Sequence, residues 1–337
     1  KNENFVDKFG KWVRSNFFIP DARSMWIKPS VKYLSGYLKS NPVDAIFTDG
    51  PPHTNTMIGL KLSQKFDIPW LSDYQDPWTQ VDYYKLLTLM PFANKKHHLL
   101  EKNCLAHANA LTIASDTWAV DLGELANKNV DVLYYGYDEN DFAELKTSLD
   151  TEFTIFHGGL LGYDRFPEMM FESLVELIHE KVIDSDKLKI NLAGQVDYSI
   201  KEYLNNSALK GNVEFLGLLK RKEVLQRLLN TQMILLPINK AENAKGRIPG
   251  KLFECLRAKR PILCLGSPNA DTSRIVESTR SGKAVDYNNK SEIKHIIKRR
   301  YLLFVDNSNT IESIGIEQYT NRNQTKKVAN ILNLISS

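Results

Sequence analysis

The segment GRIPGKLFECLRAKRPILCLG, residues 246–266, combines a short helical pattern with an apolar run that is typical of a buried strand. Pro249 and Gly250 fit the opening of the helix, because proline is favoured in the first helical turn. Helical spacing then places Lys251 and Glu254 on one face near the N-terminal end. The apolar residues that we expect to face a core are Leu252, Phe253 and Leu256. A helix joined to a buried strand predicts one repeat of a parallel α/β sheet.

Strand and helix patterns alternate along the chain from residue 44 onward, which predicts a parallel α/β architecture. The strands expected in the first half are residues 45–50, 68–73, 110–115 and 130–136. Those expected in the second half are residues 153–159, 188–194, 212–217, 233–238 and 260–266. Four of the strands expected in the second half end at glycines, Gly158, Gly194, Gly217 and Gly266. Ligands of parallel α/β sheets bind at the carboxyl ends of the strands.

A polar stretch without a strand pattern, residues 138–150, separates the two halves. We expect an N-terminal Rossmann-like domain over residues 1–142 and a C-terminal one over residues 143–315. The last stretch, residues 316–337, is expected to form a helix that packs back on the N-terminal domain. The first half opens in a helix-like stretch without an initiating methionine, so we expect its sheet to lack early strands here.

Composition excludes several classes of protein. The 44 basic residues nearly balance the 40 acidic ones, so we expect no nucleic-acid partner that depends on a large positive field. Three cysteines without a C-x-x-C pair predict reduced thiols and a cytoplasmic protein. No apolar run approaches the roughly 20 residues of a membrane span, and the start has no signal-peptide pattern.

The N-terminal end of the helix that carries Lys251 and Glu254 suits a nucleotide. Unpaired backbone N–H groups and the helix dipole attract phosphate there. A carboxylate can accept two hydrogen bonds from a ribose diol, and each charge-assisted bond contributes about 1.5–3 kcal/mol. The alternative is a capped helix whose Lys251 and Glu254 form a surface ion pair.

This segment resembles the nucleotide-binding helix of family 4 retaining glycosyltransferases, which have the GT-B fold of two Rossmann-like domains facing a cleft. The resemblance extends over about residues 40–330. It implies that Glu254 holds the nucleotide ribose. The family has a second glutamate where this chain has Gly246, so the identity of the sugar does not follow from the resemblance.

The strand, glycine turn and basic residue of IFHGGLLGYDR, residues 155–165, predict a phosphate cradle. They resemble the family's donor pyrophosphate loop, which implies donor contacts from Gly158, Gly159 and Arg165. Leu160 stands where the family has an arginine, so Arg247 or Lys251 is expected to supply that charge.

The stretch from residue 213 to 238 resembles the strand, glycine, helix and strand that line the base in this family. A base is expected to bind near the backbone of Gly217 and Leu218, because a turn without a side chain allows close approach. We also count Ile248, beside Arg247, among the donor-binding residues.

Two polar stretches of the first half follow strands and are expected at the rim between the domains. TDGPPHTNTM, residues 48–57, and SDYQDPW, residues 72–78, resemble segments of bacterial polysaccharide-assembly members of the family. We predict His53 and Asp76 as catalytic residues, with Asp73 as an alternative proton acceptor, because such groups at cleft edges suit hydrogen bonding and proton transfer. The alternatives are a structural histidine and a capping aspartate.

The resemblance implies a glycosyltransferase that moves a sugar from a nucleotide diphosphate sugar to a carbohydrate or lipid-linked acceptor in cell-surface polysaccharide synthesis. We expect no cofactor and no metal, since His97 and His98 are adjacent and point to different helix faces. Basic and apolar residues in 8–18 and 85–98 fit either peripheral contact with a membrane or a solvated helix face. A non-catalytic nucleotide-sugar-binding protein and a nucleotide-sugar 2-epimerase on the same fold are the alternatives.

Overall fold

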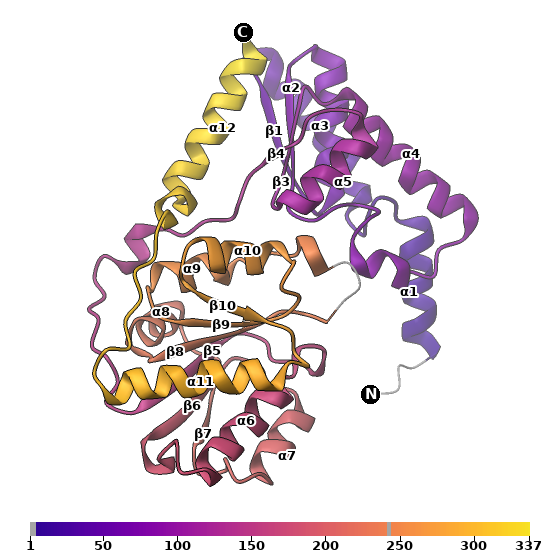
Figure 1. Ribbon diagram of the computed structural model, residues 1–337. Coiled ribbons are helices and arrows are strands. Elements are labelled where there is room, and N and C mark those ends of the chain that lie inside the picture. The colour runs from indigo at the N-terminus through magenta and orange to yellow at the C-terminus, as the bar shows by residue number, and fades with distance from the viewer. Residues whose placement is uncertain (1–4, 241–243) are drawn as a thin grey trace. The chain divides into compact units, whose positions relative to one another are not determined.

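A computed structural model describes residues 5–240 and 244–337 of the chain (Figure 1). Its contacts divide the chain into two compact units. Unit 1 contains the chain up to Tyr134 together with Gln324–Ser337, and unit 2 contains Tyr135–Asn323. Residues 135–142, which the sequence analysis assigns to the N-terminal domain, therefore have their contacts in unit 2.

Unit 1 is built on a parallel sheet in which sequence neighbours pair in the order β1-β2-β3-β4. All five residues of β2, which has a neighbouring strand on each side, are buried. The strands are β1 (Ile46–Gly50), β2 (Trp70–Tyr74), β3 (Ala110–Ile113) and β4 (Asp131–Val132).

Three helices of unit 1, over residues 53–66, 91–107 and 116–126, contribute apolar side chains to a core that contains Trp70, Leu105 and Trp118. Ser115 begins one of them by accepting a hydrogen bond from the backbone N–H of Trp118 at 3.2 Å. The helices are α1 (Phe5–Phe17), α2 (Ile27–Ser40), α3 (His53–Phe66), α4 (Pro91–His107), α5 (Asp116–Ala126) and, mostly in this unit, α12 (Asn321–Ser336).

Unit 2 has a doubly wound parallel sheet with the strand order β10-β9-β8-β5-β6-β7. The chain runs outward from β5 to β7, returns to the other side of β5, and runs outward again to β10. The order therefore reverses between β5 and β8, which is where ligands bind in such sheets. The strands are β5 (Phe153–Gly158), β6 (Leu188–Ala193), β7 (Val213–Gly217), β8 (Met233–Pro237), β9 (Ile262–Leu265) and β10 (Gly282–Val285).

Helices cover both faces of this second sheet (Figure 1). One face carries α9 and α10, and the other carries α6, α7 and α11. The helices are α6 (Glu168–His179), α7 (Tyr198–Asn205), α8 (Arg221–Asn230), α9 (Lys251–Arg257), α10 (Asp271–Ser278) and α11 (Lys290–Val305). Short 3-10 turns are η1 (Ser24–Trp26), η2 (Asp82–Leu86), η3 (Glu139–Phe142), η4 (Tyr163–Arg165), η5 (Ser185–Lys187), η6 (Ala244–Gly246) and η7 (Ile316–Tyr319).

The structure confirms the predicted alternation of strands and helices and differs from it in two places. The predicted strand 130–136 shortens to Asp131–Val132, because the following backbone makes other contacts: the N–H of Tyr137 donates to Tyr319 at 3.0 Å. The sequence analysis missed β10, whose four residues include only two apolar side chains larger than glycine. A run of this length is too short to be recognised as a strand from the spacing of apolar residues in the sequence.

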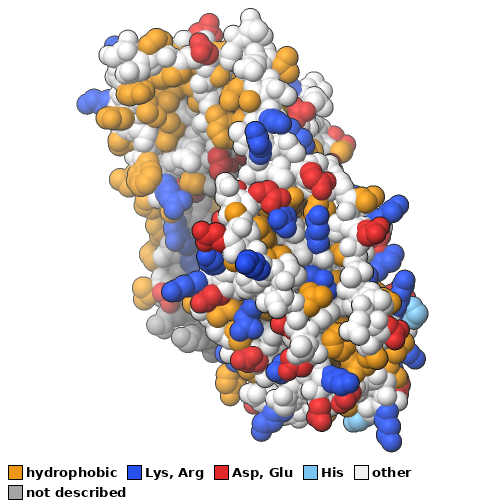
Figure 2. Space-filling model, turned by 90° about the vertical axis from the view of Figure 1, so that its left-hand side faces the viewer, with side chains coloured by type: hydrophobic (Ala, Val, Ile, Leu, Met, Phe, Trp, Pro, Cys, Tyr) orange, Lys and Arg blue, Asp and Glu red, His pale blue; other side chains and the backbone are white. Residues whose placement is uncertain are grey.

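Acidic and basic side chains are interspersed over the viewed face of the molecule (Figure 2). This distribution matches the near balance of 44 basic and 40 acidic residues in the chain. Within the described residues, no helix combines the length and the hydropathy that a membrane crossing requires.

Candidate nucleotide site in unit 2

Three glycines meet at the carboxyl ends of β5, β6 and β7. The N–H of Gly159 donates to the carbonyl of Ala193 at 2.9 Å, and the N–H of Gly194 donates to that of Gly217 at 2.6 Å. Gly194 has a φ of +103°, and a Cβ there would collide with the backbone of Gly159. Only glycine allows the strand ends to lie this close together.

Lys251, the first residue of α9, reaches the same edge of the sheet. Its Nζ donates to the carbonyl of Gly158 at 3.1 Å and lies 3.2 Å from the position that a Cβ on Gly159 would occupy. Burial lowers the pKa of Lys251 to about 8; nearby Cys255 opposes this shift and Arg165 adds to it. Near pH 7 the ammonium group is therefore mostly protonated, so α9 holds a fixed cation against the Gly158–Gly159 turn.

Arg165 supplies a second cation near this turn. It ends η4, its Nη2 pairs with Asp164 Oδ2 at 3.0 Å, and its side chain is 19% exposed. Its charge contributes to the lowered pKa of Lys251 and of His157. The structure thus brings together Gly158, Gly159, Lys251 and Arg165, and two cations beside backbone amides suit a diphosphate.

His157 lies in β5 directly before this turn and is fully buried. Burial lowers the pKa of its imidazole to about 3, and the charge of Lys251 adds to the effect. Its Nδ1 lies 3.1 Å from the carbonyl oxygen of Leu235. The imidazole is neutral near pH 7, so it adds no positive charge to the site.

Helical spacing would allow Glu254 to pair with Lys251, but in the structure its partner is Arg221. Its Oε1 pairs with Arg221 Nη1 at 2.6 Å, and the Nη2 of the same arginine pairs with Asp141 Oδ2 at 2.6 Å. Burial raises the pKa of Glu254, and the charge of Arg221 opposes the rise. The side chain is 17% exposed, so the carboxylate keeps some access to solvent while Arg221 holds it.

The other predicted donor residues lie in different environments. Gly217 has a φ of +63°, and the side chain of the next residue, Leu218, is 90% exposed. Arg247 is partly buried, and its carbonyl accepts a hydrogen bond from Thr272 Oγ1 at 2.8 Å. Ile248 is 5% exposed and belongs to the hydrophobic interior.

His53 and Asp76, the predicted catalytic residues, both lie in unit 1. His53 begins α3 and stacks on Trp78 with ring centroids 4.5 Å apart. Burial lowers the pKa of His53 to about 3, opposed by Asp21 and reinforced by His97. A group with so low a pKa is a weak base near neutrality, so the imidazole suits hydrogen bonding better than proton abstraction.

A cavity of about 220 Å³ opens beside His53 in unit 1. Its lining includes Arg14, Asp21, Trp78 and His97. Asp21 orients the start of α3, because its two carboxylate oxygens accept hydrogen bonds from the N–H and the Oγ1 of Thr54, both at 2.8 Å. Neutral His53 is therefore held at the wall of a polar and aromatic cavity.

Aspartates gather at the carboxyl ends of β1 and β2. Asp76 lies in the turn after β2 and is partly exposed, whereas Asp73 is buried within the strand. Burial and the neighbouring charge of Asp49 raise the pKa of Asp73 to about 6, although Thr112 donates a hydrogen bond to it. Asp73 is thus closer than His53 to the pKa that a general base needs near pH 7.

Sequence reasoning missed three residues that shape these sites: Arg221, Asp49 and Asp21. Arg221 follows Lys220 at the start of a helix, where a basic residue carries no specific signal. Asp49 is the second-last residue of β1 and lies opposite Asp73 in register, a pairing that can be predicted only if the order of the strands is known. Asp21 contacts Thr54 from a distant part of the chain, so no local pattern marks it.

Comparison with solved structures gives the same architecture at low sequence identity. Sucrose-phosphate synthase from Thermosynechococcus elongatus matches with a TM-score of 0.58 and 12% identity, over 93% of this chain and 76% of that one. Anabaena HepE in complex with UDP-glucose matches with a TM-score of 0.55 and 14% identity, over 91% and 80%. The chain has the GT-B fold.

A third similar structure is S. aureus TarM, with a TM-score of 0.58 and 14% identity. The match covers 91% of this chain and 59% of TarM, so the chain spans less than two thirds of that protein. Comparisons with protein-family models and with curated proteins give no match. The likeness therefore concerns the fold, and the function has to be argued from the residues.

Proposed function

We propose that this chain is a glycosyltransferase that uses a nucleotide diphosphate sugar as donor. The observation that carries the proposal is the position of Lys251, buried against the Gly158–Gly159 turn at the carboxyl end of β5, with Arg165 nearby. A buried cation needs a compensating anion, and the turn offers none among its own atoms. A diphosphate at this edge would meet both cations.

Sugar transfer builds negative charge on the departing nucleotide diphosphate. Lys251 and Arg165 are fixed before the donor arrives, so they stabilise that charge without reorganising. Removal of one such donor commonly costs about 10²–10³ in rate. Arg247 and the backbone near Gly159 are assigned to the same role, which places the diphosphate between η4 and the start of α9.

Glu254 is assigned to the ribose of the nucleotide. It lies one helical turn after Lys251, so a nucleotide whose diphosphate meets Lys251 extends naturally toward it. The charge of Arg221 and its hydrogen bond to Glu254 oppose the rise in pKa that burial causes at this carboxylate. The base is assigned to the backbone of Gly217 and Leu218, with Ile248 as an apolar neighbour of the donor.

Unit 1 is assigned to the acceptor, a carbohydrate or a lipid-linked carbohydrate. His53 would position a hydroxyl group by hydrogen bonding, and Asp73 or Asp76 would take its proton. The similar structures that contain nucleotide sugars or nucleotides, HepE with UDP-glucose and TarM with UDP, support a nucleotide-linked donor. We further propose retention at the anomeric carbon, metal-independent transfer, and a cytoplasmic role in bacterial cell-surface polysaccharide synthesis, with peripheral membrane contact.

A thermal-shift panel of UDP, GDP, CDP and their sugars tests the donor site. A nucleotide at 100 times its dissociation constant should stabilise the protein by about 2.7 kcal/mol. Glu254→Gln should weaken that nucleotide about tenfold to hundredfold, since it loses charge-assisted hydrogen bonds of about 1.5–3 kcal/mol each. Glu277→Gln is the matched control, because Glu277 makes a long surface pair with Lys283 at 3.7 Å. Equal nucleotide binding by both variants would refute the ribose assignment.

Turnover separates this proposal from its two alternatives. A transferase releases the nucleoside diphosphate from its donor, slowly even with water as acceptor. A 2-epimerase instead isomerises the intact nucleotide sugar, and a binding protein does neither. Chromatography of the donor after prolonged incubation distinguishes the three outcomes.

A further inference from the structure

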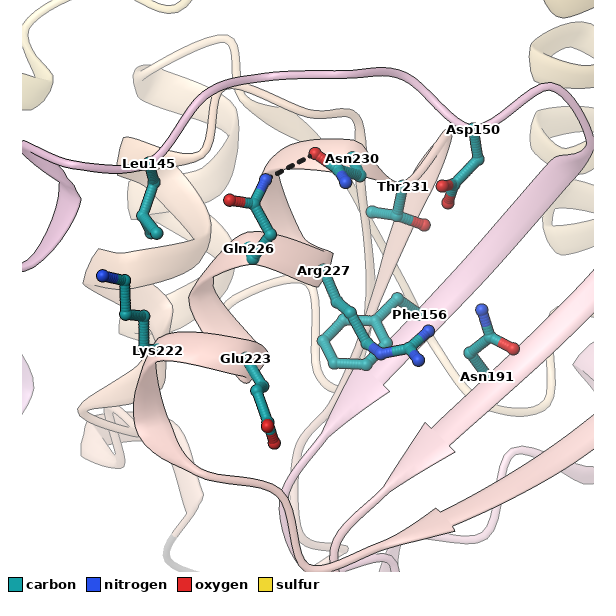
Figure 3. Close-up of a pocket in the computed structure, with 10 residues that line it drawn as sticks. All are labelled: Leu145, Asp150, Phe156, Asn191, Lys222, Glu223, Gln226, Arg227, Asn230 and Thr231. Carbon is teal, nitrogen blue, oxygen red and sulfur yellow. Dashed lines mark hydrogen bonds between the residues drawn. The ribbon is translucent and has the colours of Figure 1, made fainter.

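Besides the cavity beside His53 in unit 1, unit 2 contains a cavity that lies under α8 and is separate from the residues assigned to the donor. It has a volume of about 490 Å³ and is bounded by α8, by β5 and β6, and by the chain segment that enters β5 (Figure 3). This volume falls within the roughly 300–1,000 Å³ range of small-molecule sites. None of the proposed donor residues lines it.

Asn191 places a polar group in the wall of this cavity. It occupies β6 between Phe156 and Glu214 in register and is 7% exposed. Its Oδ1 is buried and has no hydrogen-bond partner among the described residues. Buried side-chain polar atoms are nearly always hydrogen-bonded, so an amide without a partner at a cavity wall points to a ligand.

Arg227 reaches into the cavity from the opposite side. Its side chain extends from α8 toward Phe156 and Asn191 on the strands (Figure 3). In residues 5–240 and 244–337 its guanidinium makes no hydrogen bond or ion pair, although its charge acts on Asp150 across the cavity. The guanidinium therefore has donors available opposite the Asn191 amide.

The remaining lining indicates the class of ligand. Lys222 and Arg227 are balanced by Asp150 and Glu223, which disfavours a strongly anionic ligand such as a phosphate. Phe156 is 1% exposed, so it offers no open ring face on which a nucleobase could stack. What remains is a mixture of donors and acceptors around one small volume, and a ring that carries several hydroxyl groups matches such a mixture.

We propose that this cavity binds a neutral saccharide unit, with Asn191 and Arg227 as the residues that hold its hydroxyl groups. The amide both donates and accepts, and the guanidinium donates, so adjacent hydroxyls on one ring can satisfy both side chains. The inference does not rest on the donor assignment, because no residue is shared between the two sites.

Saturation-transfer NMR and calorimetry with the full chain test the proposal. The probes are the methyl glycosides of glucose, galactose and mannose, N-acetylglucosamine, and maltose, with glucuronate, inorganic phosphate and uridine for comparison. At least one neutral sugar should bind in the millimolar range or tighter and should bind better than the three comparison ligands. Failure of every neutral sugar at 10 mM, or tighter binding of phosphate, glucuronate or uridine, overturns the proposal.

Two substitutions locate the binding. Asn191→Leu keeps the volume of the side chain and removes the amide, and Arg227→Met keeps its length and removes the charge. Each should weaken the sugar at least tenfold, and Arg227→Met keeps the test valid if Asn191→Leu does not fold. Lys189→Met is the matched control, because Lys189 lies on the same strand but pairs with Glu152 at 2.5 Å and does not line the cavity.

Comparison with the donor site separates the two hypotheses. Arg227→Met should leave nucleotide binding unchanged, and Glu254→Gln should leave sugar binding unchanged. Sugar binding that survives both Asn191→Leu and Arg227→Met would place the saccharide elsewhere and overturn this inference without affecting the donor proposal.

Discussion

Lys251 is mostly protonated near pH 7, although its buried position lowers the pKa of its ammonium group. Burial lowers its pKa to about 8, well below the ordinary lysine value of 10.5, so its charge is lost within a pH range in which the protein can be studied. A bound diphosphate would favour the ammonium form. Nucleotide binding should therefore be linked to the protonation of this one group.

The affinity for a nucleoside diphosphate should fall as the pH rises through about 8, by up to tenfold for each further pH unit, because an increasing fraction of Lys251 is neutral before binding. Calorimetry between pH 7 and 10 measures this directly. Lys251→Met should bind more weakly throughout and lose the alkaline dependence. A wild-type affinity that stays constant across this range would show that Lys251 does not contact the diphosphate.

At the scale of elements, Gly159 and Gly194 determine how closely the carboxyl ends of β5 and β6 can approach each other. Gly194→Ala would put a Cβ against the backbone of Gly159, at a φ of +103° that side chains rarely adopt. The strain alone costs about 1–3 kcal/mol. The displaced turn should also lose its contact with Lys251, so both stability and nucleotide affinity should fall.

Urea unfolding and nucleotide titration of Gly194→Ala measure the two effects. Gly211→Ala is the control, because a Cβ there has no neighbour within 4 Å. That substitution should change the free energy of unfolding by less than about 1 kcal/mol. Equal stability of the two variants would mean that the turn after β6 accommodates a side chain by shifting.

The elements that could be predicted from sequence are those with strong local patterns. Three buried strands of unit 2, β5, β6 and β9, are nearly continuous apolar runs that end at or just before a glycine, so the ends of these strands could be placed on one edge of the sheet. The short β10 has no such run. Partners such as Arg221 for Glu254 depend on how α8 packs beside α9, and helical spacing within α9 alone indicated Lys251 instead.

At the scale of the whole molecule, both units contain a buried histidine whose pKa is strongly lowered, His53 in unit 1 and His157 in unit 2. Burial lowers the pKa of both imidazoles to about 3 from the ordinary histidine value of 6.5. Between these values the unfolded chain binds protons that the folded units do not. Each histidine therefore contributes stability that is present above pH 6.5 and is lost as the pH falls toward 3.

His157→Gln should reduce the slope of unfolding free energy against pH by nearly one proton between pH 4.5 and 6, or about 1.4 kcal/mol per pH unit. The test compares the slopes and not the free energies of unfolding themselves, because the substitution also lowers the stability at every pH. If the two units unfold separately, the change should be confined to the transition of unit 2, and His53→Gln should affect only that of unit 1. Urea unfolding at several pH values, followed by tryptophan fluorescence for unit 1 and by circular dichroism for both units, measures these slopes. Unchanged slopes in both variants would mean that the imidazoles take up protons within the folded units.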